Sequence, residues 1–340
     1  MRLAIAGAQH FHLLDLLQSL STVPEVEWVG VWNIHNEFKT VFETQYPMPE
    51  FPTLEALLDQ AKPDGVACFD MIGRRADTII QCLQRGIHVL ADKPPVATEE
   101  QLQALEEALR STKATFTALF SERYNPPVYT LKQLIAAGTV GEIVNFTAFR
   151  PHKLKKTTRP NWMFQRDNYG GILVDLAVHD IDVFQWLTGA KPVLITAAHS
   201  NTVCPEFPEF EDNGQIFFKA DNGAVGFIKV EWLAPEAFPT HGDCRYFITG
   251  AQGTLEVFTG GDITDRGGKV ILCTHRHPPE LVPLNPMETG LYADFLAKTT
   301  ADGPTGSPMI TVSEIISTMR VALAARKAAD RNCMITLDWN

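Results

Sequence analysis

Short, almost continuously apolar runs alternate with amphipathic stretches through the first third of the chain. The runs are expected to form strands at Leu3–Ala6, Val26–Trp32, Val66–Phe69, Val89–Ala91 and Ala114–Phe120. The stretches between them carry apolar residues at helical spacing and are expected to form helices at Phe11–Leu20, Leu54–Ala61, Ala76–Arg85 and Glu99–Leu109. This alternation predicts a doubly wound parallel α/β sheet.

After Phe120 the pattern changes to strands separated by turns. The β-rich runs lie at Ile143–Arg150, Val193–Ser200, Gly214–Lys219, Ala224–Trp232, Arg245–Thr249, Thr254–Phe258 and Val270–Thr274. Turn signals such as Asp221-Asn222-Gly223 favour antiparallel pairing. Helical stretches at Leu173–Leu187 and Val312–Ala328 are expected to cover one face of the resulting sheet. This part of the chain therefore predicts an α+β domain with a large, mostly antiparallel open sheet.

Length and composition exclude several classes of protein. A chain of 340 residues is long for one core, so two domains are expected, residues 1–122 and residues 123–340. Asp and Glu (40) outnumber Lys and Arg (29) and give a formal charge of −11, so nucleic acid is not expected as a partner. No apolar run is long enough to span a bilayer, so no membrane partner is expected either.

The six cysteines are scattered through the sequence and form no Cys-x-x-Cys pair. The chain starts with Met1-Arg2-Leu3-Ala4-Ile5-Ala6-Gly7, a segment that is too short and too soon interrupted for a signal peptide. Dispersed thiols in such a chain indicate reduced cysteines. The expected location is cytoplasmic.

The first βα turn carries a reduced glycine motif. Gly7 follows the first strand and precedes a helix, which is where the pyrophosphate of a dinucleotide would rest. The run is Gly7-Ala8-Gln9-His10-Phe11-His12, so Gln9 and His12 stand where Gly-x-Gly-x-x-Gly has glycines. Gln9 would hold the backbone away from the phosphates, and His12 would crowd the helix against the strand. The loop fits a cofactor site, with Gly7, Gln9, His10, Phe11 and His12 as its residues, or a plain βα turn.

Asn33 stands at the end of the second strand, roughly where an acidic residue would bind the ribose hydroxyls of a dinucleotide. An amide can still bond a hydroxyl, and it lacks the charge that repels a 2′-phosphate. The choice between NAD and NADP is therefore left open.

Lys93 closes a predicted parallel strand and is followed by Pro94 and Pro95. Ligands of open α/β sheets bind at the carboxyl ends of the strands, so a lysine fixed there is a candidate for the site. Asp92 beside it could pair with the lysine or approach the nicotinamide ribose.

Asp175 and His179 follow the double glycine Gly170-Gly171 at a spacing of i, i+4, which would put both side chains on one face of a helix. A lysine, an imidazole and a carboxylate at one site can bind an alcohol, take its proton and hold the resulting cation, as alcohol–carbonyl redox with a hydride acceptor requires. The alternative is a surface helix whose polar stripe faces water.

The motifs together resemble the glucose–fructose oxidoreductase / inositol dehydrogenase / MocA (Gfo/Idh/MocA) family of NAD(P)-dependent oxidoreductases. That family has a Glu-Lys-Pro motif at the end of a Rossmann strand and a Gly-Gly-x-x-x-Asp-x-x-x-His motif in the second domain. The matching runs are Asp92-Lys93-Pro94, Gly170 to His179, Arg123-Tyr124-Asn125-Pro126, Gly138 to Ile143, Ile248 to Glu256 and Ala293-Asp294-Phe295-Leu296. The resemblance covers nearly the whole chain and implies that residues 1–122 form a Rossmann dinucleotide-binding domain and residues 123–340 a substrate-binding and oligomerisation domain.

The resemblance also implies roles for individual residues. Lys93 would bond the reacting hydroxyl, His179 would be the general base in oxidation and the acid in reduction, and Asp175 would orient His179 or hold a neighbouring hydroxyl. The cofactor side would include Asn33, Asp70, Met71, Arg75, Asp92 and Lys93 besides the first loop. Arg123, Trp162 and Arg166 would join the catalytic trio in binding substrate. The expected substrate is a secondary alcohol of a sugar, cyclitol or related polyol, and the expected assembly is a homodimer or homotetramer.

The sequence departs from the family on the cofactor side. The glycine loop is interrupted at Gln9 and His12, the ribose-binding acid is Asn33, and the family's Ala-Thr-Pro-Asn-x-x-His segment is replaced by Phe69 to Arg75. Two other functions therefore stay open. One is an NAD-dependent glycosidase or epimerase that oxidises its substrate transiently, and the other is a non-catalytic nucleotide-binding sensor of the same fold.

No metal site is expected. The two His-x-His runs, His10-Phe11-His12 and His275-Arg276-His277, have no cysteine or carboxylate nearby at ligand spacing.

Overall fold

The computed structural model describes residues 1–261, 266–299 and 307–339, which fall into two compact units. Unit 1 comprises Met1–Leu119, Asp167–Tyr169 and Thr289–Ile316, and unit 2 comprises Phe120–Arg166, Gly170–Glu288 and Ser317–Asn340. Where the sequence predicts a single boundary between residues 122 and 123, the chain leaves unit 1 after Leu119 and later returns to it. Contacts within unit 1 explain the return, because Thr115 and Thr117 donate hydrogen bonds to the carbonyls of Lys298 and Ile310.

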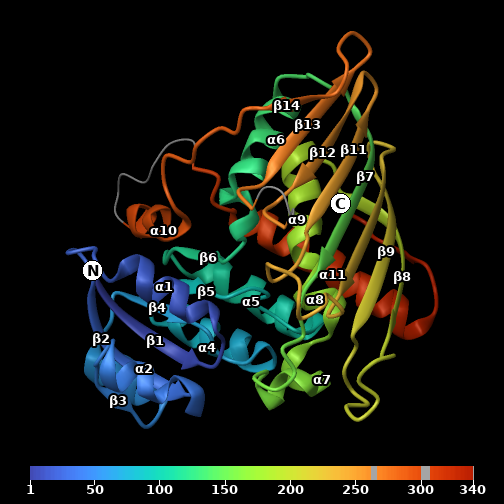
Figure 1. Ribbon diagram of the computed structural model, residues 1–340. Coiled ribbons are helices and arrows are strands. Elements are labelled where there is room, and N and C mark those ends of the chain that lie inside the picture. Colours follow the sequence, from blue (N-terminus) through green and yellow to red (C-terminus); the bar gives the residue numbers. More distant parts are fainter. Residues whose placement is uncertain (262–265, 300–306, 340) are drawn as a thin grey trace. The chain divides into compact units, whose positions relative to one another are not determined.

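Unit 1 is built on a six-stranded parallel sheet in the order β3-β2-β1-β4-β5-β6 (Figure 1). Its strands are β1 (Arg2–Ala8), β2 (Glu27–Ile34), β3 (Glu50–Phe51), β4 (Gly65–Cys68), β5 (His88–Ala91) and β6 (Phe116–Ala118). The predicted doubly wound sheet is confirmed. The strand order reverses direction between β1 and β4, the point at which open α/β sheets bind their ligands.

Helices join the strands of unit 1. They are α1 (His12–Leu20), α2 (Lys39–Thr44), α3 (Leu54–Ala56), α4 (Ile72–Gln84), α5 (Glu99–Ser111) and, from the returning segment, α10 (Leu291–Thr299). The predicted helix over 54–61 is a short α-helical turn followed by a π-helical stretch at Leu57–Ala61. Helix α5 is capped by Thr98, which accepts a hydrogen bond from the N–H of Gln101 at 3.2 Å.

Unit 2 contains a nine-stranded sheet in the order β14-β13-β12-β11-β7-β10-β9-β8-β15. Its strands are β7 (Ile143–Pro151), β8 (Pro192–Ser200), β9 (Asn213–Ala220), β10 (Val225–Glu231), β11 (Arg245–Gly250), β12 (Gly253–Phe258), β13 (Lys269–Thr274), β14 (Glu280–Val282) and β15 (Ile335–Thr336). Only the β7–β10 pair is parallel among the described strand pairs of this sheet. The predicted open and mostly antiparallel sheet is therefore confirmed.

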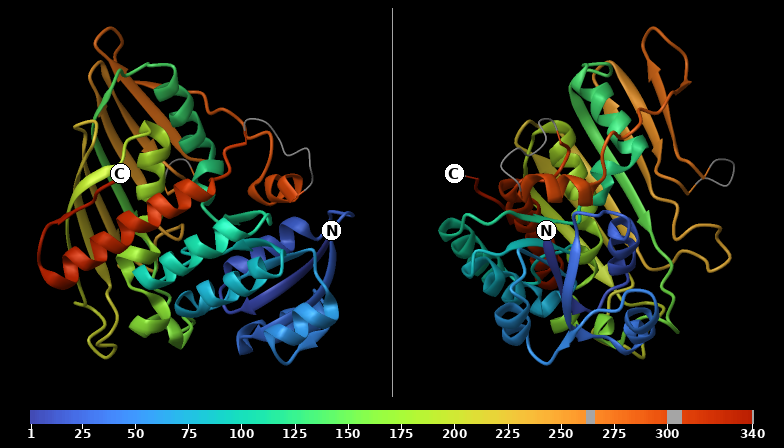
Figure 2. Two further views of the ribbon diagram at one scale, coloured as in Figure 1. Left: turned by 180° about the vertical axis from the view of Figure 1, so that it is seen from behind. Right: turned by 90° about the vertical axis from the view of Figure 1, so that its left-hand side faces the viewer.

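One face of this sheet is covered by helices and the other is open (Figure 2). The covering elements include α6 (Pro126–Ala136), α8 (Ile172–Asp175) and α9 (Ala177–Thr188), which contact strands of the sheet. Phe184 of α9 packs against Phe146 and Phe218 with ring centroids 5.5 and 4.7 Å apart. On β9 buried residues alternate with exposed ones, as a sheet with a single covered face requires.

The predicted continuous helix over 173–187 is wrong. The structure has α8 and α9, with Leu176 between them outside both helices. Helix α8 itself begins directly after Gly170 and Gly171, whose φ angles of 81° and 93° turn the chain sharply. Two further helices, α7 (Arg166–Tyr169) and α11 (Val312–Arg331), contribute residues to both units. Among the described residues, no helix combines the length and the apolar character that crossing a membrane requires.

Candidate functional site

The first glycine of the β1–α1 loop is required by its surroundings. Gly7 has a φ of 73°, and a Cβ at this position would lie 2.4 Å from the Cα of Asp70. The loop therefore passes directly over the end of β4, which any side chain at position 7 would prevent. The next residues differ in exposure, since Gln9 and His10 are buried while Phe11 is 47% exposed.

The side chain of Gln9 turns toward the end of β2. Its Nε2 donates to the backbone carbonyl of Asn33 at 2.7 Å and to the Asn33 Oδ1 at 3.2 Å. Asn33 in turn donates from Nδ2 to Asp70 Oδ1 at 3.3 Å. One hydrogen-bonded chain therefore links the ends of β1, β2 and β4, and Gln9 supports the position of Asn33.

Asp70 is held by its own loop. Its Oδ1 accepts from the N–H of Met71 at 2.9 Å, and its Oδ2 accepts from Thr78 Oγ1 at 3.0 Å. Burial raises the pKa of this carboxyl group above its usual value. The end of β4 therefore presents a buried carboxyl group directly beside Asn33.

Arg75 ties the loop after β4 to the loop after β5. Its buried guanidinium donates to the carbonyl of Asp70 at 2.8 Å, to the carbonyl of Pro94 at 2.7 Å and to Asp92 Oδ2 at 3.1 Å. These bonds fix the backbone on either side of Lys93.

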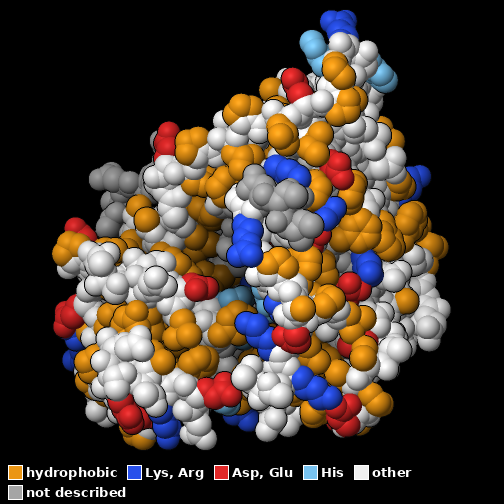
Figure 3. Space-filling view, viewed as in Figure 1, with side chains coloured by type: hydrophobic (Ala, Val, Ile, Leu, Met, Phe, Trp, Pro, Cys, Tyr) orange, Lys and Arg blue, Asp and Glu red, His pale blue; other side chains and the backbone are white. Residues whose placement is uncertain are grey.

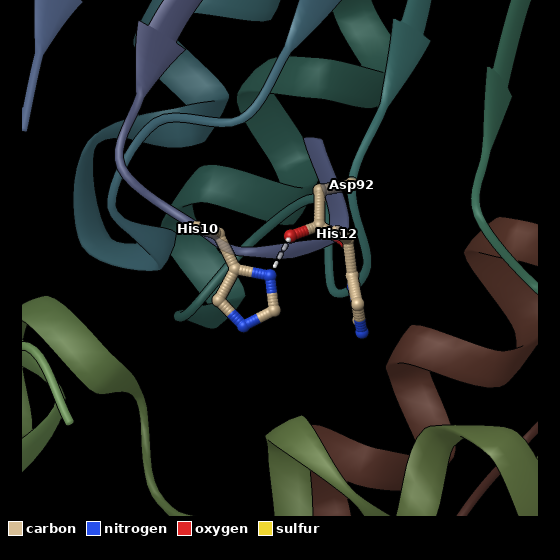
Figure 4. Close-up of side chains that lie close together, drawn as sticks. All are labelled: His10, His12 and Asp92. Carbon is tan, nitrogen blue, oxygen red and sulfur yellow. Dashed lines mark hydrogen bonds and ion pairs between the residues drawn. The ribbon is translucent and has the colours of Figure 1, made fainter. Parts of the chain in front are cut away.

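Asp92 lies at the centre of a cluster that includes both histidines of the first loop (Figure 4). His10 Nδ1 is 2.9 Å from Asp92 Oδ2, and His12 Nδ1 is 2.8 Å from Asp92 Oδ1. The N–H of Lys93 also donates to Oδ1, at 2.8 Å. The expectation that no carboxylate lies near these histidines fails, because β5 brings Asp92 to the loop from 80 residues away in the sequence.

The protonation states within this cluster are set by opposing effects. Burial raises the pKa of Asp92, but the charges of His12 and Arg75, together with the hydrogen bond from His10, outweigh it and hold the pKa well below its usual value. Burial lowers the pKa of His10 to about 4, although Asp92 opposes that shift. At neutral pH the cluster therefore contains an ionised Asp92 and a neutral His10.

In unit 2, Asp175 and His179 lie on either side of the break between two helices. Asp175 is the last residue of α8 and is 2% exposed, and His179 is in the first turn of α9 and is 7% exposed. The N–H of His179 bonds to the carbonyl of Leu176 at 3.3 Å, and the imidazole ring stands edge-on to Phe120. Both side chains are thus buried near the glycine-led turn and do not belong to a solvated surface stripe.

The two predicted substrate-binding arginines are engaged in ion pairs. Arg123 is buried and bonds to Asp182 through Nη2 at 2.6 Å and through Nε at 3.0 Å. Arg166 pairs with Glu211 and with Asp330, the latter at 2.8 Å. The third predicted residue, Trp162, is buried in a 3₁₀ turn at Asn161–Phe164.

A second buried network on α9 is not evident from the sequence. Arg150 of β7 bonds to Asp180 at 2.7 Å, to Glu122 at 2.8 Å and to the hydroxyl of Tyr246 at 2.8 Å. Burial and the charge of Asp180 act in opposite senses on Arg150, and its pKa is raised well above the usual value. The only sequence signal is an arginine at an inward position of β7, where an apolar residue would be expected.

The fold and the strand-end residues of unit 1 define a Rossmann-type dinucleotide-binding protein, and comparison with known proteins identifies its family. The model of the NAD-binding Rossmann fold of an oxidoreductase family, GFO/IDH/MocA, matches residues 1–120, and the model of the family's C-terminal domain matches residues 128–256. Together they match more than half of the chain. The chain belongs to the Gfo/Idh/MocA family of oxidoreductases, as the sequence motifs predict.

Individual relatives are distant. The chain is 23% identical to the rhizopine catabolism protein MocA of Rhizobium meliloti over 83% of this chain and 81% of that protein. It is 24% identical to the scyllo-inositol 2-dehydrogenase (NAD⁺) of Bacillus subtilis over 60% of this chain, and it spans 57% of the length of that relative. A solved structure from Erwinia carotovora atroseptica superposes with a TM-score of 0.86 at 28% identity and covers 97% of this chain and 98% of that chain. A structure from Thermotoga maritima has a TM-score of 0.88 at 25% identity, covering 99% and 100% of the two chains.

Proposed function

We propose that this chain is an NAD(P)-dependent dehydrogenase or reductase that acts on a secondary alcohol of a sugar, cyclitol or related polyol. The observation that carries the proposal is the set of residues at the carboxyl ends of the unit 1 strands. Gly7, Asn33, Asp70 and Lys93 follow or end β1, β2, β4 and β5, around the reversal of strand order. Family membership and the names of the relatives, which include inositol dehydrogenases, support the substrate class.

The residues of this edge fit a dinucleotide. Gly7 lets the backbone pass close over β4, and α1 begins shortly after it, so the helix N-terminus is available to a pyrophosphate. Asn33 offers an amide to a ribose hydroxyl. The N–H of Met71 bonds to the buried carboxyl of Asp70, and Arg75 bonds to the backbone carbonyl of Asp70. Arg75 contributes to nucleotide binding indirectly, because its hydrogen bonds fix the positions of Asp92 and Pro94.

Oxidation of a secondary alcohol removes a hydride from carbon and a proton from oxygen. Nicotinamide, when bound, accepts the hydride. We assign the proton to the imidazole of His179 and the binding of the hydroxyl to the ammonium group of Lys93, which favours the alkoxide by its charge. Asp175 orients the imidazole or bonds a second hydroxyl. In the reductive direction His179 returns the proton.

Arg123 has a positioning role in this proposal. Its ion pair with Asp182 anchors α9, the helix that carries His179. Trp162 and Arg166 are assigned to substrate binding. Arg166 can bind a substrate only if an anionic group of that substrate replaces Glu211 or Asp330 as its ion-pair partner.

Binding of the dinucleotide is the first prediction. NAD, NADH, NADP or NADPH should raise the melting temperature, because a ligand at 100 times its dissociation constant stabilises the folded state by about 2.7 kcal/mol. Gly7→Ala should abolish the shift, since its Cβ would meet Asp70. Gly138→Ala is the matched control, because Gly138 has the same left-handed φ of 72° with open space around it. If none of the four nucleotides stabilises the unaltered protein, the dehydrogenase proposal is wrong. The alternative of a nucleotide-binding sensor is then wrong as well.

Substrates can be sought among the compounds named for the relatives. Inositols, D-glucosides and levoglucosan form a short panel. Net formation of reduced nucleotide with any of them supports a dehydrogenase. A nucleotide that copurifies and is never released in reduced form supports the glycosidase or epimerase alternative.

We also propose a homodimer or homotetramer that assembles through the open face of the unit 2 sheet. Phe149, Phe227 and Phe247 form an aromatic row on this face, and Phe217 and Phe247 are 48% and 38% exposed. The face turned to the viewer in Figure 3 carries many hydrophobic side chains. Exposed aromatic side chains grouped on one sheet face are typical of a protein interface.

The test of this interface is a charge placed on it. Phe217→Arg combined with Phe247→Arg should convert the oligomer to a monomer in light scattering coupled to gel filtration, because both side chains are exposed and their replacement leaves the core intact. Val203→Arg, at a 57% exposed position in the loop between β8 and β9, is the control. If the unaltered protein is a monomer at micromolar concentration, the proposed oligomer is wrong.

A cytoplasmic location is also proposed. It is supported by the six cysteines, all of which are free thiols, four of them buried. The excess of acidic residues supports a small-molecule substrate and argues against nucleic acid as a partner.

A further inference from the structure

Three metal-ligating side chains converge in unit 1 from two separate segments. His10 and His12 come from the β1–α1 loop, and Asp92 follows β5. One possible ligand atom from each residue lies within 4.8 Å of the corresponding atoms of the others. We propose that His10, His12 and Asp92 form a binding site for a divalent transition metal ion.

The type of donor selects the class of ion. Two imidazole nitrogens and one carboxylate form a donor set of intermediate softness, which suits zinc, cobalt(II), manganese(II) or iron(II). Calcium and magnesium prefer sites made entirely of oxygen. Three protein ligands also leave positions for water or another oxygen ligand, as in open metal sites.

The separations of the donor atoms are compatible with one ion. The Nδ1 atoms of His10 and His12 lie 2.9 and 2.8 Å from the two oxygens of Asp92. Ligands held at right angles by bonds of about 2.0–2.2 Å are about 2.8–3.1 Å apart. The two imidazole–carboxylate separations therefore fall in the range shown by neighbouring ligands of one ion.

Two further hydrogen bonds orient the carboxylate of Asp92. The N–H of Lys93 bonds to Oδ1 and the Arg75 guanidinium to Oδ2. Such outer bonds hold a metal ligand in place and tune its affinity. Arg75 also adds a positive charge beside the site, which opposes a cation. We therefore expect an affinity weaker than that of a structural zinc site.

Solvent can reach the site through His12. In the absence of an ion, the three residues can form hydrogen bonds with one another instead. The side chain of His12 is 27% exposed, and Figure 4 shows its ring extending away from Asp92. Without an ion, the same nitrogen atoms can donate hydrogen bonds to Asp92. Metal binding must displace these two bonds, and a direct measurement of binding distinguishes the two states.

The experiment uses the full-length, tag-free protein, stripped with EDTA and free of nucleotide. Titration with zinc, cobalt(II) and manganese(II), followed by calorimetry and by the visible spectrum of cobalt, should show one ion per chain. His12→Ala should weaken binding about 100-fold or more. His12→Cys, which restores a ligand, should recover much of the affinity. The matched control is the double variant His275→Ala, His277→Ala, which removes the exposed His-x-His pair of unit 2 and should bind as the unaltered protein does.

Absence of stoichiometric binding, or binding that His12→Ala leaves unchanged, overturns the proposal and makes the cluster a hydrogen-bonded hub around Asp92. Circular dichroism of each variant shows whether it has folded, and the partly exposed position of His12 makes its alanine variant the safest to interpret. The readout needs neither nucleotide nor substrate, so it is independent of the thermal-shift test of the dehydrogenase.

Discussion

Replacing His179 by alanine should lower kcat for alcohol oxidation by about 10²–10⁴-fold, the usual contribution of a general base. The imidazole is the group to which the proposed mechanism assigns the hydroxyl proton, and it is buried at the start of α9. Nucleotide affinity should change little, because His179 belongs to unit 2 and the cofactor residues belong to unit 1. The measurement is stopped-flow formation of reduced nucleotide with the best substrate of the panel, together with nucleotide titration of the same variant.

Two further readouts separate a base from a merely structural residue. The acidic limb of the pH profile of kcat/KM should disappear in the alanine variant, and added imidazole should restore part of the rate. His275→Ala, at an exposed position in unit 2, serves as the control and should retain full activity. An unchanged single-turnover rate in the His179 variant would remove that residue from the mechanism.

Asp182→Ala should destabilise the protein by about 3–5 kcal/mol, the usual effect of breaking a buried ion pair by removing one partner. The carboxylate is 1% exposed and bonds to both Nε and Nη2 of Arg123, which is buried as deeply. Urea unfolding, followed by tryptophan fluorescence, should show the loss as a lower midpoint.

The control is an exposed pair of the same type. Asp59 lies 3.7 Å from Arg85 and its side chain is 66% exposed, so Asp59→Ala should cost at most about 1 kcal/mol. The double variant Asp182→Leu, Arg123→Met should lose less than Asp182→Ala alone, because no charge is then left at the site. Equal losses for Asp182→Ala and Asp59→Ala would show that the buried pair does not anchor α9.

Most of the secondary structure could be predicted because it follows from local periodicity. The apolar runs of unit 1 correspond to β1, β2, β4, β5 and β6, and the β-rich runs of unit 2 to β7 through β13. The elements that were not predicted are short or depend on distant contacts, as with β15, which pairs with β8 from the far end of the chain. Helix α6 had an available signal, since Pro126 and Pro127 stand in its first turn, where proline is favoured.

The break between α8 and α9 had a weaker signal. The i, i+4 spacing of Asp175 and His179 fits an unbroken helix, and nothing in the sequence at Leu176 opposes one. The structure nevertheless places buried acids on several sides of α9, where Asp180 bonds to Arg150 and Asp182 to Arg123. Such partners lie on distant elements, so periodicity alone cannot reveal them.

The cofactor side shows the same limit. Gly7 was recognised because a glycine between the first strand and a helix is a local signature, and its positive φ and close approach to Asp70 explain the glycine. The role of Gln9 in supporting Asn33, and the meeting of His12 with Asp92, depend on the order of the strands in the sheet. Residues that look like defects in a glycine motif are thus bonded parts of the strand-end network.

The return of the chain to unit 1 near its end has a consequence for biosynthesis. The hydrogen bonds from Thr115 and Thr117 beside the edge strand β6 end on carbonyls of Lys298 and Ile310, and α1 contacts α10. A ribosome must therefore synthesise strands β7 to β14 of the second unit before the first unit can acquire its last segment. The nascent unit 1 then has all six strands of its sheet but lacks α10 and the carbonyls that Thr115 and Thr117 bond while the second sheet emerges, a period in which chaperones have a surface to bind.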